Sequence, residues 1–215
     1  MKRLSYLASI ALVLGVVVGT TPVTAQAATT ALKCKATKAV GHAPKVVKQP
    51  IGTSVGKNGK MTLVTNCGNI VILTYGKKAP NTVKMIGTLA KAGFYNASLC
   101  HRLTTAGLYV LQCGDPTATG SGGPGFQYPD ENLPKAVSNN YPAGTVAMAN
   151  SGPGTNSSQF FLVFANTTLN PSYTIWGKVT SGLDILKAIA AKGVVGGGGD
   201  GTPAQTVAIE KVIVS

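Results

Sequence analysis

The sequence predicts a mainly β protein, a closed eight-stranded antiparallel β-barrel capped by two helices. Three observations lead to this prediction: eight short runs rich in β-branched and aromatic residues, two amphipathic segments placed early and late, and glycine- and proline-rich stretches between the runs. The chain has 215 residues, 44% of them hydrophobic. That is enough for one substantial core and too little for two ordinary domains.

The strand candidates follow one another with turn residues between them. The first two are joined by Asn-Cys-Gly-Asn at 66–69, which is typical of a hairpin turn. A loop rich in glycine and proline is predicted for 114–134, and the four glycines at 196–199 predict a flexible turn. The eight candidates are residues 61–65, 70–75, 99–103, 108–112, 145–149, 159–164, 173–179 and 207–214.

Two segments have apolar residues at helical spacing. The first begins at Pro80, a residue favoured in the first helical turn, and Gly93 is placed to end it. The second covers about 182–191. Their apolar stripes are Val83, Ile86, Leu89 and Ala90 in the first, and Leu183, Leu186, Ile189 and Ala190 in the second.

Residues 1–27 have the order of a secretory signal peptide: a basic start, an apolar run at 7–18, and small residues before a cleavage point after Ala27. The apolar run is shorter than the ~20 residues of a membrane-spanning helix. A lipid anchor at Cys34 is disfavoured because Lys33 interrupts its signal. We therefore expect an extracytoplasmic or secreted protein with no membrane span after cleavage.

Residues 28–58 predict a flexible basic extension, because they are rich in Lys, Ala, Thr, Gly and Pro without any sustained period. The folded domain is expected at 59–215. The net charge of the whole chain is +13. Such a charge suits polyanions, but the lysines are scattered and no nucleic-acid-binding motif is present. A solvated basic surface is the preferred interpretation, and we expect no nucleic-acid partner.

Four cysteines, an even number, are compatible with disulfides in an exported protein. Three pairings are possible, and the sequence favours only weakly the one that would attach the extension to the domain, Cys34 with Cys67. Cys100 and Cys113 would then pair or remain reduced neighbours. No Cys-x-x-Cys spacing exists and only two histidines are present, so no metal site is predicted.

The strongest functional signal is a series of segments in a fixed order. Phe-Tyr-Asn-Ala-Ser-Leu-Cys-His-Arg at 94–102 is followed by Gln-Cys-Gly-Asp-Pro at 112–116. Gly-Thr-Val-Ala-Met-Ala-Asn at 144–150 and Gly-Pro-Gly-Thr-Asn-Ser-Ser-Gln-Phe-Phe at 152–161 come later. From about Met61 to its C-terminus, the chain resembles the cyclophilin family of peptidyl-prolyl cis-trans isomerases. The Leu-Thr-Thr-x-Gly insertion at 103–107 is similar to that of actinobacterial members.

The resemblance implies a reaction that needs no cofactor or metal. A prolyl peptide bond rotates slowly because its C–N bond has partial double-bond character. A fixed cationic donor near the imide nitrogen favours the twisted transition state over the substrate. Arg102 matches the catalytic arginine of the family, and Gln112 matches the glutamine that orients it and contacts the substrate backbone.

The resemblance also implies a substrate pocket. Tyr109 falls on a pocket position whose alignment depends on the insertion, and Leu108 competes for it because alternate strand residues share a face. The substrate-binding residues implied are Tyr109, Val110, Ala149, Asn150, Phe161, Leu169 and Tyr173.

Two further positions shape the expectations. His101 precedes Arg102 on a strand and should face away from it, so a structural role is expected. Thr168 stands where many eukaryotic members have a tryptophan that contacts cyclosporin, so weak cyclosporin binding is expected.

The expected protein is a monomeric isomerase that acts on proline-containing peptides and unfolded exported proteins. The alternative is a chaperone-like binding module for such segments, with incidental turnover.

Overall fold

The computed structural model describes residues 33–52 and 56–215, which belong to one unit of the chain at 31–215. The predicted signal peptide and the first residues of the predicted extension lie outside the described residues. Within the described ranges, no helix has the length and apolar character needed to cross a membrane.

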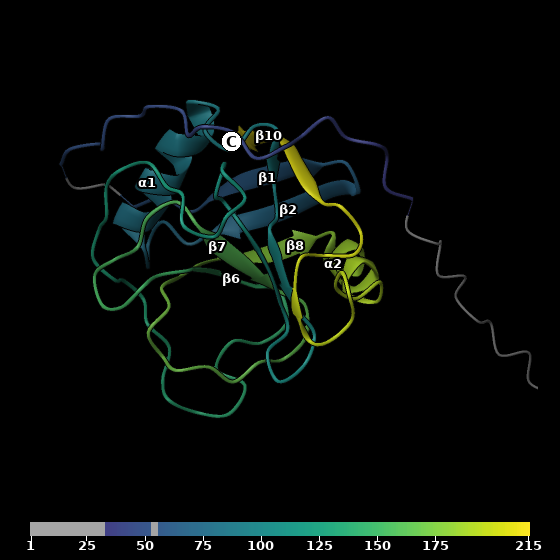
Figure 1. The fold of residues 1–215 in the computed structure, drawn as a ribbon. Helices are drawn as coiled ribbons and strands as arrows, with labels where there is room; N and C mark the ends of the chain where they lie inside the picture. The colour runs from purple at the N-terminus through teal and green to yellow at the C-terminus, as the bar shows by residue number, and fades with distance from the viewer. Residues whose placement is uncertain (1–32, 53–55) are drawn as a thin grey trace, which may run out of the picture. The chain divides into compact units, whose positions relative to one another are not determined.

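A curled antiparallel sheet forms the centre of the fold (Figure 1). It has ten strands, in the order β3-β10-β1-β2-β8-β6-β7-β5-β4-β9. The mainly β prediction is confirmed, but the sheet is a curled half-barrel of ten strands, with β3 and β9 at its two ends, in place of a closed barrel of eight. The candidate at 99–103 divides into two strands, and one strand follows the glycine run. The strands are β1 (Gly59–Thr65), β2 (Gly68–Thr74), β3 (Ser98–Leu99), β4 (Arg102–Thr104), β5 (Val110–Cys113), β6 (Thr145–Met148), β7 (Phe160–Val163), β8 (Ile175–Ser181), β9 (Asp200–Gly201) and β10 (Ala208–Val214).

The chain itself joins the two ends of this sheet. β3 pairs with β10 at one end, and β4 pairs with β5 and β9 at the other. The strands β3 and β4 both lie within the single segment 98–104. Between these two strands, the Cys100 N–H donates to the Val207 carbonyl at 2.9 Å. The curl therefore brings residue 102 to a position between strands that are far apart in the sequence.

Two helices pack against the sheet, and they form at the two segments where helices were predicted. Helix α1 (Pro80–Lys91) packs against β10, and α2 (Leu183–Ala190) packs against β2 and β8 (Figure 1). The start of α1 is capped from a distance, because the Glu131 carboxylate accepts hydrogen bonds from the Asn81 and Thr82 N–H groups at 3.1 and 2.8 Å. An anion at this position also interacts favourably with the helix dipole.

Alternation along the strands builds the core. In β1, Met61 and Leu63 are buried while their neighbours are partly exposed, as expected for a half-buried strand. The largest buried side chain is Trp176, whose ring meets Phe160 edge to face at 5.7 Å between centroids. Phe160 meets Tyr95 in the same way at 5.8 Å. Such contacts add about 0.5–1.5 kcal/mol to the free energy of burial.

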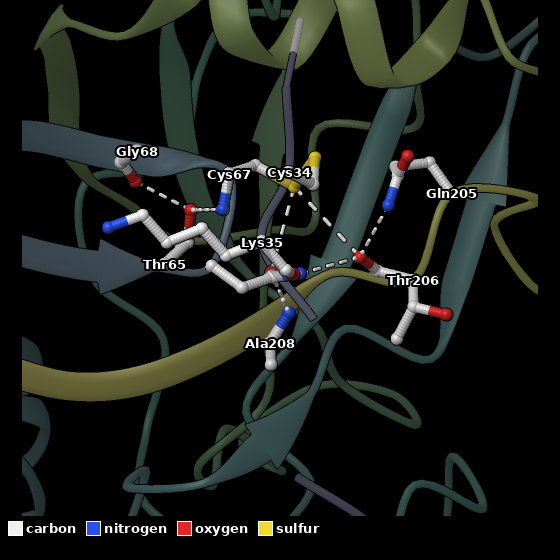
Figure 2. Close-up of a disulfide and its surroundings, with 9 residues drawn as sticks. Cys34, Lys35, Thr65, Cys67, Gly68, Gln205, Thr206 and Ala208 are labelled. Carbon is white, nitrogen blue, oxygen red and sulfur yellow. Dashed lines mark hydrogen bonds between the residues drawn. A yellow bond between two sulfur atoms is a disulfide. The ribbon is translucent and has the colours of Figure 1, made fainter. Parts of the chain in front are cut away.

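Residues 33–52 contain no helix or strand and follow an extended path against the domain. The Cys34–Cys67 disulfide holds the beginning of this segment (Figure 2). The Lys35 N–H donates to the Asn66 carbonyl at 2.8 Å. Further along, the His42 N–H donates to the Pro116 carbonyl at 2.8 Å. The composition of the segment did not predict this attachment along the domain.

Candidate active site

Arg102 and Gln112 are direct cross-strand partners on β4 and β5. Opposite residues of an antiparallel pair place their side chains on the same face. The Arg102 Nη1 donates to Gln112 Oε1 at 3.3 Å, and Gln112 Nε2 donates to Gln159 Oε1 at 2.9 Å. Gln159 in turn donates to the Gly120 and Gly122 carbonyls. Because the amide nitrogen of Gln112 donates to Gln159, its amide oxygen is the atom that faces Arg102.

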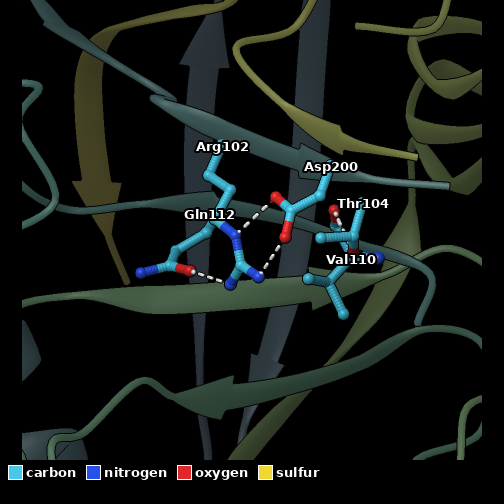
Figure 3. Close-up of polar contacts among 5 residues, drawn as sticks. All are labelled: Arg102, Thr104, Val110, Gln112 and Asp200. Carbon is cyan, nitrogen blue, oxygen red and sulfur yellow. Dashed lines mark hydrogen bonds and ion pairs between the residues drawn. The ribbon is translucent and has the colours of Figure 1, made fainter. Parts of the chain in front are cut away.

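A carboxylate that the sequence did not predict completes the surroundings of Arg102. Asp200 on β9 accepts from Arg102 Nε at 2.7 Å and from Nη2 at 2.6 Å (Figure 3). The hydrogen bond to Asp200 raises the pKa of Arg102, and the same bond lowers the pKa of Asp200. The arginine is therefore a permanent cation with a fixed orientation. Asp200 follows the glycine run, which carries no local signal of such a role.

A cavity of about 160 Å³ lies beside this pair. Its walls come from β5, β7 and the segments that follow β6 and β7. Eight of the nine predicted catalytic and substrate-binding residues line it together with Leu108: Arg102, Val110, Gln112, Ala149, Asn150, Phe161, Leu169 and Tyr173.

Tyr109 is the predicted pocket residue that does not line the cavity. Its ring contacts Phe164 instead, at 6.0 Å between centroids, and Leu108 takes the pocket position. The reason is the alternation of the strand: Leu108, Val110 and Gln112 share one face, and Tyr109 lies on the other. The prediction that Tyr109 lines the pocket is therefore wrong, and Leu108 occupies that position.

The rings of Phe161 and Tyr173 line the cavity, and the ring of Tyr141 packs against both of them. Phe161 meets Tyr173 edge to face at 5.6 Å between centroids, and Tyr141 lies 6.1 Å from Phe161. Tyr141 is fully buried, and its hydroxyl accepts from the Tyr173 N–H at 3.0 Å and donates to the Tyr173 carbonyl at 3.1 Å. Burial raises the pKa of Tyr141 to about 12. Tyr141 therefore supports the wall as a neutral phenol, a role that no sequence motif indicated.

A second, larger cavity of about 730 Å³ shares Gln112, Ala149 and Asn150 with the first. Its other side is the loop at 120–127, and its lining is mainly polar. Asn150 is held in place because its Nδ2 donates to the Ser172 carbonyl at 2.8 Å. The two cavities thus form one continuous surface along which an extended peptide can lie.

Asp115 organises the loop between these cavities and the rest of the domain. Its buried carboxylate accepts from the N–H groups of Thr117, Gly120 and Gly122 at 2.8, 2.8 and 3.0 Å. Burial would raise the pKa of Asp115, but the hydrogen bond from the Thr117 hydroxyl at 2.7 Å and those from the N–H groups together outweigh it, and the pKa lies below the usual value. Gly122 is required here, because a Cβ atom at this position would lie 2.0 Å from Asp115 Oδ1.

His101 lines neither of the two cavities that Gln112 shares. Neither ring nitrogen has a hydrogen-bond partner among the described residues. Burial lowers the pKa of His101, and the nearby Asp115 carboxylate opposes that shift. The ring is thus a packing element next to the glycine-rich loop.

The second disulfide lies beside the site and joins Cys100 to Cys113. Cys113 follows Gln112 directly, and Cys100 is two residues before Arg102. The bond therefore links the segment that carries the arginine to the strand that carries the glutamine.

Fold and site together define a β-sheet protein with a small pocket, lined by aromatic, aliphatic and amide side chains, beside a cation held by two partners. The chain belongs to the cyclophilin family: the model described as "Cyclophilin type peptidyl-prolyl cis-trans isomerase/CLD" matches residues 60–214. A "Probable peptidyl-prolyl cis-trans isomerase B" of Mycobacterium tuberculosis is 45% identical over 181 residues, covering 79% of this chain and 57% of that protein. A "Probable peptidyl-prolyl cis-trans isomerase A" of Mycobacterium leprae is 34% identical, covering 77% of this chain and 97% of that protein.

The chain spans less than two thirds of the length of the B-type relatives. It covers 57% of the Mycobacterium tuberculosis protein and 66% of the isomerase B of Mycobacterium leprae. Among solved structures, a cyclophilin type isomerase of Cryptosporidium parvum matches with a TM-score of 0.64 and 25% identity, covering 74% of this chain and 98% of that one. The same protein in the presence of the dipeptide Ala-Pro matches with a TM-score of 0.63.

Proposed function

We propose that this protein is a peptidyl-prolyl cis-trans isomerase in which Arg102 stabilises the twisted amide. One observation carries the proposal: the guanidinium, oriented by Gln112, lies at the side of a cavity that has Phe161 at its floor. An aromatic floor suits a pyrrolidine ring, and the cation suits the lone pair that the imide nitrogen gains when the bond twists. A relative in the family was crystallised in the presence of Ala-Pro, which supports this class of ligand.

The geometry supports a mechanism based on electrostatic stabilisation. A guanidinium has five N–H donors, and three of those of Arg102 bind Gln112 and Asp200. Two donors remain, one on each terminal nitrogen, for the substrate. Because the donors are held before the substrate arrives, no reorganisation is needed as the charge develops. Ala149 and Asn150 lie between the cavities, where they can bind the peptide backbone.

We further propose that the substrates are unfolded exported proteins. The apolar run after a basic start at the N-terminus supports export. The two disulfides also support it, because disulfides persist in oxidising compartments outside the cytoplasm. The measurement that checks this is the location of the chain, and the residue at its mature N-terminus, after expression in a bacterium that exports it. A chain retained uncleaved in the cytoplasm would contradict the proposal.

The alternative function is a binding module for proline-containing segments. Turnover distinguishes the two, measured with a protease-coupled prolyl peptide assay on wild type and Arg102→Ala. We expect the substitution to lower kcat/KM by roughly 100-fold, the typical loss when one donor to a transition state is removed. Arg102→Lys, which keeps the charge without the planar fork, is expected to be intermediate.

Two controls make the result specific. Melting temperatures test folding, and fluorescence titration with a proline-containing peptide tests binding. If Arg102→Ala keeps the wild-type kcat/KM, the proposed mechanism is wrong. If the wild type binds the peptide without any turnover, the binding module is the better description.

A further inference from the structure

The ion pair between Arg102 and Asp200 stands out in its charge environment. It is the only ion pair among residues 33–52 and 56–215, although lysines are spread through both ranges. It also involves the one arginine of those ranges, the other arginine of the chain being Arg3. The whole chain has only six acidic residues, and one of them, Asp200, binds the proposed catalytic arginine.

The carboxylate binds the arginine in the bidentate geometry that fixes a guanidinium most tightly. Its two oxygens accept from Nε and Nη2, while Gln112 accepts from Nη1 (Figure 3). Acceptors on two sides of the planar group leave it little freedom to rotate. The arginine side chain is 41% exposed, so without such partners it would sample several rotamers in water.

The insertion at 103–107 provides the place where Asp200 is held. It extends β4 beyond Arg102, and β9 pairs with that extension, Leu103 opposite Gly201 and Thr104 opposite Asp200. Asp200 is therefore the diagonal cross-strand neighbour of Arg102, within reach of a long side chain. The Thr105 N–H donates to the Gly199 carbonyl at 2.7 Å, which anchors the approach to β9.

We propose that Asp200 is a positioning residue for Arg102, presented by β9 on the extended β4, and that it holds the two free N–H donors of the guanidinium toward the proline pocket. The proposal rests on the isomerase function proposed above. Asp200 is not required for the fold, because its side chain is 54% exposed and its hydrogen bonds go to Arg102 alone. Its effect is on the fraction of molecules whose arginine is oriented for reaction.

The first test compares Asp200→Ala with wild type in the prolyl peptide assay. We expect kcat to fall by roughly three- to tenfold with little change in KM, because Gln112 still accepts from Nη1 of the arginine and the pocket that binds proline is intact. Asp200→Asn keeps one acceptor oxygen and should lie between the two. Glu210→Ala is the matched control, since it removes an exposed carboxylate on β10 and should leave kcat unchanged.

The second test observes the arginine directly by NMR. The full chain has two arginine Nε–H groups, those of Arg3 and Arg102, and Arg102→Lys identifies the second signal. We expect the Arg102 Hε to exchange slowly with water in the wild type, because it is bonded to Asp200 Oδ1 at an Nε–O distance of 2.7 Å. Exchange should become fast in Asp200→Ala and stay slow in Glu210→Ala.

The third test moves β9 without changing any charge. A Cβ atom at Gly199 would lie 2.6 Å from the Ala106 Cβ, so Gly199→Ala must displace the segment that carries Asp200. We expect a loss of kcat similar to that of Asp200→Ala. Combining the two substitutions should add no further loss, because both act through the same contact.

The outcomes separate this inference from the proposed function. An unchanged or increased kcat in Asp200→Ala, with Arg102→Ala inactive, would overturn the positioning role and leave the isomerase proposal standing. Fast Hε exchange in the wild type would also overturn it. If Arg102→Ala is as active as wild type, the proposed mechanism itself fails, whatever the Asp200 variants do.

Discussion

The disulfide beside the active site leads to a quantitative prediction. Cys100 and Cys113 are buried, at 4% and 0% exposure, and join the segment before Arg102 to the end of β5. The perturbation is the double variant Cys100→Ala/Cys113→Ala, because alanine leaves no buried polar group behind. The matched control is Cys34→Ala/Cys67→Ala, which releases the N-terminal segment from the domain.

The magnitude follows from the loop that each bond closes. A sequence separation of 13 for Cys100–Cys113 corresponds to about 3 kcal/mol of unfolded-state chain entropy, and 33 for Cys34–Cys67 corresponds to about 3.7 kcal/mol. We expect Cys100→Ala/Cys113→Ala to lose the full free energy of unfolding calculated for its loop, because both cysteines belong to the sheet region. We expect Cys34→Ala/Cys67→Ala to lose less than the value calculated for its loop, because residues 33–52 have no strand or helix and can detach without unfolding the sheet.

The assay is urea unfolding followed by the fluorescence of the one tryptophan, Trp176, which is fully buried in the core. With a slope of about 1–3 kcal/mol per molar urea, a loss of 3 kcal/mol lowers the midpoint by roughly 1–3 M. The free energy of unfolding in water is compared for the wild type and the two double variants. The isomerase assay is run on each variant below its transition.

Two outcomes would contradict these expected losses of stability. A loss below about 1 kcal/mol for Cys100→Ala/Cys113→Ala would mean that the loop entropy is not what the bond contributes. A larger loss for Cys34→Ala/Cys67→Ala than for the site pair would mean that the N-terminal segment unfolds together with the sheet.

Two further predictions concern pH and ligand preference. Because hydrogen bonds hold the pKa of Asp115 below its unfolded value of about 3.9, its stabilising effect should be present above that value and lost as the pH falls toward the folded pKa. Urea unfolding at pH 6 and pH 3 should therefore show a smaller acid loss in Asp115→Asn than in wild type, and equal losses would contradict this. Cyclosporin should inhibit weakly, because the exposed Thr168 presents far less apolar area than a tryptophan. Thr168→Trp should tighten inhibition, and nanomolar inhibition of the wild type would show the prediction to be wrong.

Much of this protein could be predicted from local patterns. Alternation of apolar residues predicted the strands, and helical spacing predicted α1 and α2, because burial of one face depends mainly on neighbouring residues in the sequence. Motif order placed Arg102, Gln112 and Phe161 around one pocket. The insertion left open whether Leu108 or Tyr109 lines the pocket, and the strand alternation that pairs Arg102 with Gln112 places Leu108 there.

Contacts between distant segments were decided only by the tertiary structure. Asp200 meets Arg102 across 98 residues of sequence, on a strand of two residues that follows four glycines. Tyr141 reaches the pocket wall from an irregular segment, and residues 33–52 lie along the domain without secondary structure. The residues next to a polar side chain in the sequence do not indicate which distant residue it will bind. Local patterns therefore predicted a mainly β fold and most residues around the pocket, whereas the partner of Arg102 follows from the curl of the sheet, which brings β9 beside β4.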